Sequence, residues 1–463
     1  MKIFNTLSGR KEEFLPLVGN DVNMYACGIT VSGEAHVGHA YQALIYDVIR
    51  KYLEKRGYKV NYARNYTDVD DKIIAKSNET GIPADKFAAD MIEKIDEQMR
   101  RFHVDEPTVW IKATDCIGDI IGFIQKLVEK GHAYATEKGD VYFSVDSFPS
   151  YGRLSHRNLE DAINGVRVDN DELKRNPLDF ALWKSAKAGE PFWDSPWGKG
   201  RPGWHIECSA MNYKTFGEQI DIHGGGRDLI FPHHENEIAQ TEALTGKQFV
   251  KYWIHNGLIK VNGQKMSKSL GNSLLLSDLL DEYSPETIKF ALFSTNYRAD
   301  INITDALFPE AEKHLAGFYS AFKDATDKGV EIKGENKEID DAFNAAMDDD
   351  FNTALALSDL FGFFKTVRTK LAAGDLSAGA DLNQIKTTYS LLGLFTTDAD
   401  EFLNSVKSKG KAEIPKEIIA LAEERLIARK QKDWAKSDRL RDRIAQAGYE
   451  IKDAKDGYTV TKK

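Results

Sequence analysis

The chain has 463 residues, of which 42% are apolar, and a formal net charge of −10 at neutral pH. This length favours two to four domains, and the apolar fraction allows sizeable cores but is too low for a membrane-embedded protein. No stretch approaches the roughly 20 uncharged apolar residues that a membrane-spanning helix requires. The acidic balance argues mildly against nucleic acid as a partner, although the charge of a whole chain can hide a local basic patch.

The first residues and the cysteines indicate the compartment. The segment Met1–Asn5 lacks the apolar core of a signal peptide. Three cysteines, Cys27, Cys116 and Cys208, are too few for a disulfide framework in a chain of this length. We therefore expect a cytoplasmic protein with reduced thiols and no membrane segment.

The first elements along the chain predict a β-α-β unit. A buried strand over 23–29 precedes a helical pattern over 37–55, and a second strand follows over 60–65. Gly57 stands where a C-terminal helix cap belongs. Doubly wound sheets bind nucleotides at the head of such a helix, so this position is a candidate nucleotide site.

The middle of the chain predicts an interrupted sheet. Helical patterns over 79–101 and 116–130 lead into a segment, roughly 125–200, that is rich in Gly, Pro, Trp and charge. We interpret it as an insertion that splits the nucleotide-binding fold. A core strand over 219–223, with three glycines after it, and a helix from Phe231 onward would resume the sheet.

Beyond about residue 310 the patterns are mostly helical. Helices are expected over 311–323, 339–347, 353–371, 383–392 and 416–443, with loops over 374–379 and 398–412 and a strand pair over 448–460. Thr353 is the expected N-cap of its helix. The sequence thus predicts an α/β protein with a Rossmann-type doubly wound parallel sheet split by an insertion, then a helical bundle domain and a small C-terminal α+β piece.

Two short motifs lie more than two hundred residues apart: His-Val-Gly-His at 36–39 and Lys-Met-Ser-Lys-Ser at 265–269. Taken alone, the first motif could be two surface histidines, and the second could be an ordinary polar turn. In this order they indicate a site that closes on ATP from two sides. His36 and His39, at a helix start, can donate to phosphate oxygens, while Lys265 and Lys268 can neutralise the β- and γ-phosphates.

A candidate metal site lies between these motifs. Cys27 ends the first strand, Cys208 lies where the sheet resumes, and His233 and Glu237 are four residues apart on one helix face. Two thiolates, an imidazole and a carboxylate are an acceptable zinc set. By spacing alone, the favoured interpretation is that the two cysteines are small apolar core residues.

Spacing also leaves the histidine ligand open. His234 is three residues from Glu237, and His205 and His223 lie nearby in the sequence. Cys116, among isoleucines in a helical pattern, is expected in the core.

These motifs closely resemble the cysteinyl-tRNA synthetase family of class I aminoacyl-tRNA synthetases. The matching segments are 24–28 (MYACG), 36–39 (HVGH), 64–73 (RNYTDVDDKI), 203–211 (GWHIECSAM), 223–237 (HGGGRDLIFPHHENE) and 265–272 (KMSKSLGN). The likeness covers nearly the whole chain. The chain departs from the usual family pattern at Ile29, at Ser32, at Tyr41-Gln42, where the family usually has an arginine, and at Val460.

The resemblance implies one zinc ion per chain, bound by Cys27, Cys208, His233 and Glu237, and so favours His233 over His234. It implies that zinc also takes the thiolate of the substrate cysteine. Serine differs from cysteine by one atom, and a pocket of packed side chains would separate the two poorly. A metal that prefers thiolate removes the need for an editing domain.

The resemblance also assigns other residues. It places Thr67 and Trp204, with Cys27, beside the amino acid, and it assigns Gly225, Asp228 and Lys268 to ATP, which would bind with Mg²⁺. The residues alone favour a core aromatic for Trp204 and a turn residue for Asp228.

The implied activity is a two-step ligase reaction that forms cysteinyl-adenylate and then charges tRNA(Cys), carried out by a protein that we expect to be a monomer. The predicted regions are a first catalytic half at 1–124, a connective insertion at 125–200, a second catalytic half at 201–246, a stem-contact region bearing the second motif at 247–310, a helical domain for the anticodon arm at 311–404 and a basic tRNA-contacting domain at 405–463. Two alternatives remain: a ligase that joins cysteine to an amino sugar, and a catalytically silent relative that binds tRNA or senses zinc.

The last region is locally basic. On charge alone this favours a solvated charged helix surface, although a basic tail can also hold RNA phosphates. From Ser405 to Lys463 there are 16 Lys and Arg against 10 Asp and Glu. Trp434 lies among basic residues of the expected helix 417–444, where it could stack on an RNA base or anchor a core. Those basic residues are Arg425, Arg429, Lys430, Lys432, Lys436, Arg439, Arg441 and Arg443.

Overall fold

The computed structural model describes residues 1–463 except 157–172, 267–272, 410–414, 432, 455–456 and 463. The chain forms two compact units, one made of residues 1–313 with 325–396 and the other of 314–324 with 397–463. Within the described ranges, no helix is both long and apolar enough to cross a membrane.

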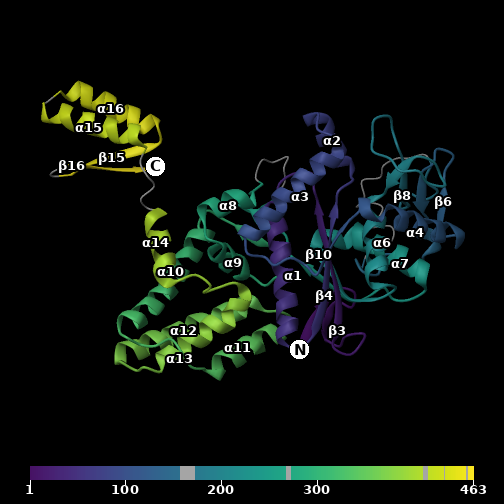
Figure 1. Ribbon diagram of the computed structural model, residues 1–463, viewed down its shortest axis with the longest axis horizontal. Coiled ribbons are helices and arrows are strands. Elements are labelled where there is room, and N and C mark those ends of the chain that lie inside the picture. The colour runs from purple at the N-terminus through teal and green to yellow at the C-terminus, as the bar shows by residue number, and fades with distance from the viewer. Residues whose placement is uncertain (157–172, 267–272, 410–414, 432, 455–456, 463) are drawn as a thin grey trace. The chain divides into compact units, whose positions relative to one another are not determined.

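A five-stranded parallel sheet forms the centre of the first unit (Figure 1). Its strand order is β11-β10-β3-β4-β5, with β3 (Asp21–Thr30), β4 (Lys59–Thr67), β5 (Val109–Lys112), β10 (Ile220–Gly226) and β11 (Val250–Asn256). The direction of winding reverses between β3 and β10. In such sheets a crevice opens at the carboxyl ends of the two strands where the order reverses. The predicted doubly wound α/β class is confirmed.

Helices cover both faces of this sheet. α1 (Val37–Lys55) lies on one side of the strands, and α6 (Trp204–Phe216) and α7 (Glu235–Thr245) lie on the other (Figure 1). Because both faces are covered, β3 is apolar along most of its length rather than alternating. The predicted bounds of α1 are confirmed, and Gly57 follows it with a φ of 90°.

A β-bulge shapes the end of β3. Ala26 pairs with Arg64 and Ile29 with Tyr66, so Cys27 and Gly28 together oppose Asn65. A Cβ at Gly28 would lie 1.5 Å from the carbonyl oxygen of Asn65, so only glycine fits. Bulges re-aim side chains, and this one accompanies the inward placement of Cys27.

The segment between α4 (Ile117–Glu129) and α6 forms a second, antiparallel sheet. Its strands, in the order β6-β7-β8-β9, are β6 (Ala133–Ala135), β7 (Val141–Phe143), β8 (Phe180–Ser185) and β9 (Gly200–Pro202). Cys116 packs in the core next to α4, as expected. This antiparallel sheet lies in the chain segment between β5 and β10, which are both strands of the parallel sheet.

The other elements of the first unit frame the sheet. They are β1 (Lys2–Asn5), β2 (Arg10–Glu13), α2 (Asp71–Thr80), α3 (Ala84–Arg101), β12 (Ile259–Val261), β13 (Gln264–Lys265), α8 (Leu276–Glu282), α9 (Pro285–Phe293), β14 (Ile301–Ile303), α11 (Lys337–Asp348), α12 (Thr353–Ala373) and α13 (Ala378–Tyr389). α10 (Leu307–Asp327) contributes residues to both units.

The second unit contains α14 (Ala399–Lys409), α15 (Lys416–Lys430), α16 (Trp434–Gln446), β15 (Tyr449–Ala454) and β16 (Gly457–Lys462). The predicted strand pair is confirmed as β15-β16. Val460 packs into a small core with Ile418, Ile444 and Ile451. Val460, which departs from the family pattern, therefore lies in the core of the second unit.

Several predicted elements are wrong. The helix expected over 79–101 is two helices, because Gly81 caps α2 with a φ of 70° and α3 begins after Pro83. The loop expected over 398–412 contains α14, whose first turn is capped by the Asp398 carboxylate. The single helix expected over 416–443 is broken, because Asp433 caps a new helix by accepting from the Lys436 amide.

Two predicted helix starts are also wrong. The N-cap of α12 is Asn352, whose side chain accepts from the Leu355 amide, and Thr353 is the first helical residue. α7 begins at Glu235 rather than at Phe231, since Phe231 precedes a proline and is extended.

Candidate active site and metal centre

A cavity of about 920 Å³ lies at the carboxyl ends of the central strands. Residues of both motifs line it: His36, Gly38 and His39 from the first, and Lys265 and Met266 from the second. A Cβ built on Gly38 would lie 3.0 Å from the His36 ring and 3.4 Å from the end of the Met266 side chain, so the two motifs approach each other at this glycine. The expectation that the motifs face one site is met in the described residues.

The histidines of the first motif shape the start of α1. Nδ1 of His36 accepts from the amides of Gly38 and His39, and Nδ1 of His39 accepts from the His36 amide. The two rings stack with centroids 3.6 Å apart. Because each Nδ1 is an acceptor, the neutral ring carries its proton on Nε2, which is then a donor. This arrangement suits the binding of phosphate oxygens at a helix N-terminus.

The second motif reaches the cavity from β13. Lys265 is exposed, and its Nζ lies 3.8 Å from a carboxylate oxygen of Asp228, which also lines the cavity. On the other side of the motif, Leu274 and Leu276 pair with the backbone beside His36. Lys268 falls within 267–272 and so lies outside the described residues.

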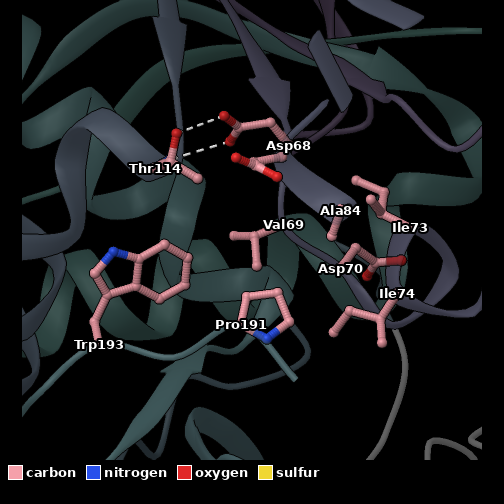
Figure 2. A pocket seen from close by; sticks show the side chains of 10 residues that line it. Asp68, Val69, Asp70, Ile73, Ile74, Ala84, Thr114, Pro191 and Trp193 are labelled. Atoms are coloured by element: carbon pink, nitrogen blue, oxygen red, sulfur yellow. Dashed lines mark hydrogen bonds between the residues drawn. The ribbon is translucent and has the colours of Figure 1, made fainter. Parts of the chain in front are cut away.

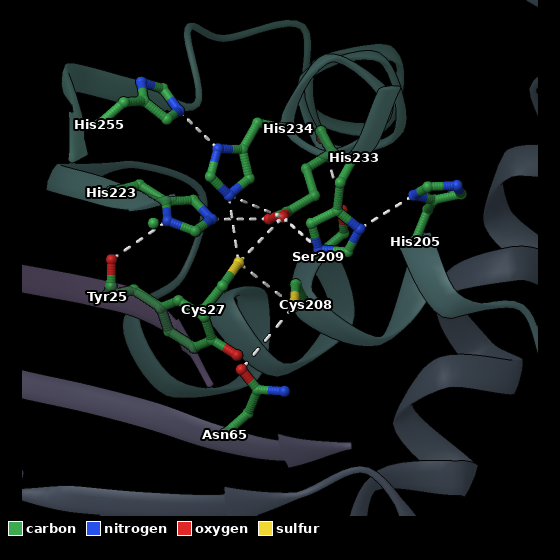
Figure 3. Close-up of polar contacts among 12 residues, drawn as sticks. Tyr25, Cys27, Asn65, His205, Cys208, Ser209, His223, His233, His234 and His255 are labelled. Carbon is green, nitrogen blue, oxygen red and sulfur yellow. Dashed lines mark hydrogen bonds and ion pairs between the residues drawn. The ribbon is translucent and has the colours of Figure 1, made fainter. Parts of the chain in front are cut away.

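Four buried side chains next to this cavity form a cluster with the composition of a zinc site (Figure 3). The ligand atoms of Cys27, Cys208, His233 and Glu237 all lie within 4.8 Å of one another. The Cys27 sulfur is 3.9 Å from the Cys208 sulfur and 3.7 Å from Oε1 of Glu237, which is 3.1 Å from Nε2 of His233. Edges of this length suit tetrahedral coordination with bonds of about 2.0–2.3 Å.

A second set, with His223 and His234 in place of Cys208 and His233, also lies within 4.8 Å. Nε2 of His223 lies 2.7 Å from Oε2 of Glu237, a hydrogen-bond distance, whereas the Glu237 oxygen that faces Cys27 and His233 is Oε1. His234 approaches the Cys27 sulfur at 3.2 Å and is held by His255 on its other nitrogen at 2.7 Å. The geometry therefore favours His233 as the ligand. His223 and His234 instead contact the ligand residues Glu237 and Cys27.

The side chains of the cluster shift one another's pKa values: burial lowers the pKa of His233, but Cys208 and Glu237 raise it to about 10. Burial raises the pKa of the Cys27 thiol, and Cys208 and Glu237 raise it further. The hydrogen bond from Cys27 lowers the pKa of Cys208 despite its burial. Burial would raise the pKa of Glu237, but His223 and His233 lower it to about 2, so this carboxylate stays ionised. Burial lowers the pKa of His234 well below its usual value, so this ring is neutral.

Trp204 connects the cluster to the cavity. Its ring stacks on His233 with centroids 4.2 Å apart, and its side chain, 39% exposed, lines the cavity. The core position that the residue type favours is therefore wrong. Thr67 is buried and donates to Oε2 of Glu207 at 3.1 Å, next to Cys208 in the chain.

The glycines at the end of β10 lie close to both parts of the site. A Cβ on Gly225 would lie 2.7 Å from Leu229 and 3.6 Å from Cβ of Cys27. Its neighbour Gly226 lines the cavity together with Asp228, while Gly225 is not among the described lining residues. Asp228 lies in a short 3₁₀ turn and is about half exposed.

A separate, smaller cavity of about 150 Å³ lies between Val69, Ile73 and Ile74 on one side and Pro191 and Trp193 on the other (Figure 2). Asp68 borders it and accepts from both the amide and the hydroxyl of Thr114. None of the predicted site residues lines this cavity.

Sequence reasoning missed several supporting residues. His255 and Thr6 extend the contacts behind His234, and the amide of Gln42 donates to the Cys27 carbonyl. Asn65 accepts from the Gly28 amide at 2.9 Å. No local motif marks these residues, although Asn65 belongs to a segment that resembles the family.

Comparison with known proteins agrees with this geometry. A family model described as the class I (C) tRNA synthetase catalytic domain matches residues 13–313, a DALR domain matches 342–396, and a cysteinyl-tRNA ligase anticodon-binding domain matches 411–460.

Curated relatives match along their whole length. The chain is 46% identical to the cysteine–tRNA ligase of Trichlorobacter lovleyi, over 99% of this chain and 98% of the relative. It is 47% identical to that of Pseudomonas aeruginosa, over 99% of both chains. Among solved structures, methionyl-tRNA synthetase of Mycobacterium tuberculosis shares the fold, with a TM-score of 0.60 at 13% identity over 85% of this chain and 93% of that one. The chain therefore belongs to the cysteinyl-tRNA synthetase family of class I aminoacyl-tRNA synthetases.

Proposed function

We propose that this chain activates L-cysteine with ATP as cysteinyl-adenylate and transfers it to the 3′-terminal adenosine of tRNA(Cys). The observation that carries the proposal is the contact of Trp204 with His233. It joins a buried cluster of thiolate, imidazole and carboxylate groups to the cavity that both phosphate-binding motifs line. A small thiol substrate at this junction would have its carboxylate on the nucleotide side.

The residues of the cavity have separate tasks in the first step. Attack of the cysteine carboxylate on the α-phosphate needs no protein nucleophile, so positioning and charge stabilisation suffice. His36 and His39 would donate to the phosphate oxygens from the positive end of α1. Lys265, with Lys268, would neutralise the leaving pyrophosphate, which we expect to be bound with Mg²⁺. Gly225 and Asp228 would border the adenosine.

The metal cluster supplies the proposed selectivity. Zinc held by Cys27, Cys208, His233 and Glu237, one ion per chain, would favour a thiolate over the hydroxyl of serine. Trp204 packs on His233 and would close the amino-acid side of the cavity. Thr67 would contact the amino acid from β4.

The second unit offers a surface for the tRNA. Trp434 is 58% exposed, so it is not a core anchor, and Arg439, Arg441 and Arg443 are exposed on the same helix. Arg425 is buried and does not belong to this surface. We infer that the exposed residues of α15 and α16 contact the anticodon region. The matched anticodon-binding domain favours tRNA over an amino sugar as acceptor.

The test is charging of purified tRNA(Cys) with labelled cysteine, with labelled serine as the control. Charging of the tRNA with cysteine but not with serine supports the proposal. ATP–pyrophosphate exchange driven by cysteine without charging would favour the amino-sugar ligase, and no exchange by the metal-replete protein would refute activation itself. Size-exclusion chromatography and cell fractionation would test the expected cytoplasmic monomer.

A further inference from the structure

The carboxylate of Asp350, which follows α11, is completely buried and accepts three hydrogen bonds. Oδ1 accepts from the Phe4 amide at 2.8 Å and from the Tyr297 hydroxyl at 2.9 Å, and Oδ2 accepts from Nε of Arg298 at 2.8 Å. None of these residues belongs to the motifs or to the metal cluster. A buried carboxylate with this many donors is fixed in place.

The backbone around Asp350 is in an unfavourable conformation. Asp350 and Phe351 both have positive φ angles, 68° and 50°, which side chains other than glycine rarely adopt. Such conformations persist where the surrounding contacts determine them, and they gather at functional positions. The three hydrogen bonds that Asp350 accepts are contacts of this kind.

Tyr297 leads from Asp350 to the nucleotide cavity. Its side chain is buried, and its carbonyl accepts from the Gly257 amide at 2.7 Å and from the Tyr41 hydroxyl at 3.2 Å. Both Gly257 and Tyr41 line the cavity. Gly257 extends the end of β11, and Tyr41 lies on α1 two residues after His39. One carbonyl thus holds two walls of the cavity.

The packing at Gly257 leaves no space for a side chain. A Cβ at this position would lie 1.9 Å from the carbonyl oxygen of Ala299. The end of β11 is therefore pressed against the segment 297–299, and a displacement of Tyr297 would displace the cavity wall.

We propose that Asp350 is a positioning residue for ATP, because it anchors Tyr297 and so fixes the cavity walls formed by Gly257 and Tyr41. This inference rests on the proposed ATP site. Asp350 lines no part of the cavity, and its link to Tyr297 is the hydrogen bond from the Tyr297 hydroxyl. Removing that hydroxyl should weaken ATP binding without changing the metal cluster, whose ligands lie on other elements.

The test uses Tyr297→Phe and Asp350→Asn, with Tyr52→Phe as the matched control. Tyr52 also lies on α1 and donates to Asp348 at the end of α11, at 2.7 Å, but it does not line the cavity. The Mg·ATP dissociation constant is measured by equilibrium dialysis without amino acid. Zinc content, cysteine affinity and thermal midpoint are measured on the same samples.

Tyr297→Phe and Asp350→Asn should each raise the ATP dissociation constant on the order of three- to tenfold. The effects of the two changes on ATP affinity should be less than additive in the double variant, since both act on the hydrogen bond between Tyr297 and Asp350, and Asp350→Asn also loses the ion pair with Arg298. Zinc content and cysteine affinity should stay at wild-type values, and Tyr52→Phe should lower only the thermal midpoint.

Wild-type ATP affinity in Tyr297→Phe would overturn the inference, even if Asp350→Asn failed to fold. An equal loss of ATP affinity in Tyr52→Phe would also overturn it, because general loosening would then explain the effect. A wild-type protein that binds ATP but shows no cysteine-dependent exchange would refute the proposed reaction alone. A wild-type protein that does not bind ATP would refute both.

Discussion

The sulfur atoms of Cys27 and Cys208 lie 3.9 Å apart, although the residues are 181 positions apart in the chain. The bulge at the end of β3 places one thiol, and α6 places the other after the chain has passed through the antiparallel sheet. This relationship makes the two residues parts of one site and predicts that they act together.

Cys208→Ser should lower zinc content and cysteine affinity together. Loss of a ligand should weaken metal binding by at least about tenfold, which is the effect of losing even a supporting residue. Metal analysis and binding of labelled cysteine provide the two measurements. Cys116→Ser is the matched control, since Cys116 is also a buried free cysteine but lies outside the cluster. Unchanged zinc stoichiometry in Cys208→Ser would remove this residue from the ligand set.

Neighbouring histidines should behave differently when each is replaced by asparagine. His233→Asn should abolish stoichiometric zinc. His234→Asn should keep the ion but weaken its affinity by about 10- to 100-fold, because His234 supports the Cys27 thiol. Competition with a chelator distinguishes the two outcomes. If His234→Asn lost zinc while His233→Asn retained it, the ligand assignment would be reversed.

The comparison of these histidines shows what the sequence could and could not predict. The bounds of α1 follow from a long amphipathic pattern and a glycine after its end, which are local signals. The choice of His233 depends on the position of His223 beside Glu237, a contact between β10 and α7 that no local spacing encodes. The resemblance supplied that choice before the geometry could.

Three of the wrong helix bounds have a common cause. Asp398, Asp433 and Asn352 each cap a helix start that the apolar pattern alone did not reveal. A polar cap can begin a helix inside a stretch whose pattern predicts one loop or one continuous helix. How much the cap stabilises that helix start depends on the tertiary packing. By contrast, the strand pair β15-β16 was predictable because apolar and polar residues alternate on both sides of Asp456-Gly457, a residue pair typical of hairpin turns.

The role of His36 as a helix cap should be separable from its role in ATP activation. His36→Asn keeps a good N-cap, whereas His36→Ala removes it at a cost of about 1 kcal/mol in unfolding free energy. Both variants lack the imidazole, so both should lose on the order of 100-fold or more in ATP–pyrophosphate exchange. Denaturant unfolding and exchange rates are measured in parallel. Wild-type exchange by His36→Asn would mean that the ring serves only as a cap.

Trp434→Ala should weaken tRNA charging without affecting activation. Stacking of a base on an aromatic ring contributes about 1–3 kcal/mol, so the KM for tRNA should rise by roughly tenfold. Cysteine-dependent exchange should stay unchanged. Ile427→Ala is the control, since Ile427 is exposed to a similar extent on α15. An equal effect of both variants would indicate general loss of apolar contact rather than stacking.

Lys289 should make stability depend on pH in the alkaline range. Lys289 is 3% exposed, and its ammonium donates to the His103 carbonyl at 2.7 Å. Burial, followed by repulsion from Lys51, lowers its pKa to about 8, although Asp47, Glu286 and Asp105 oppose the shift. The ordinary lysine pKa is about 10.4. Between these values the unfolded chain binds more protons than the folded one, so stability rises with pH. Relative to Lys289→Met, the wild type should gain up to about 3 kcal/mol between pH 8 and 10.5 by denaturant unfolding. A pH-independent difference between the two proteins would show that the ammonium titrates normally in the folded state.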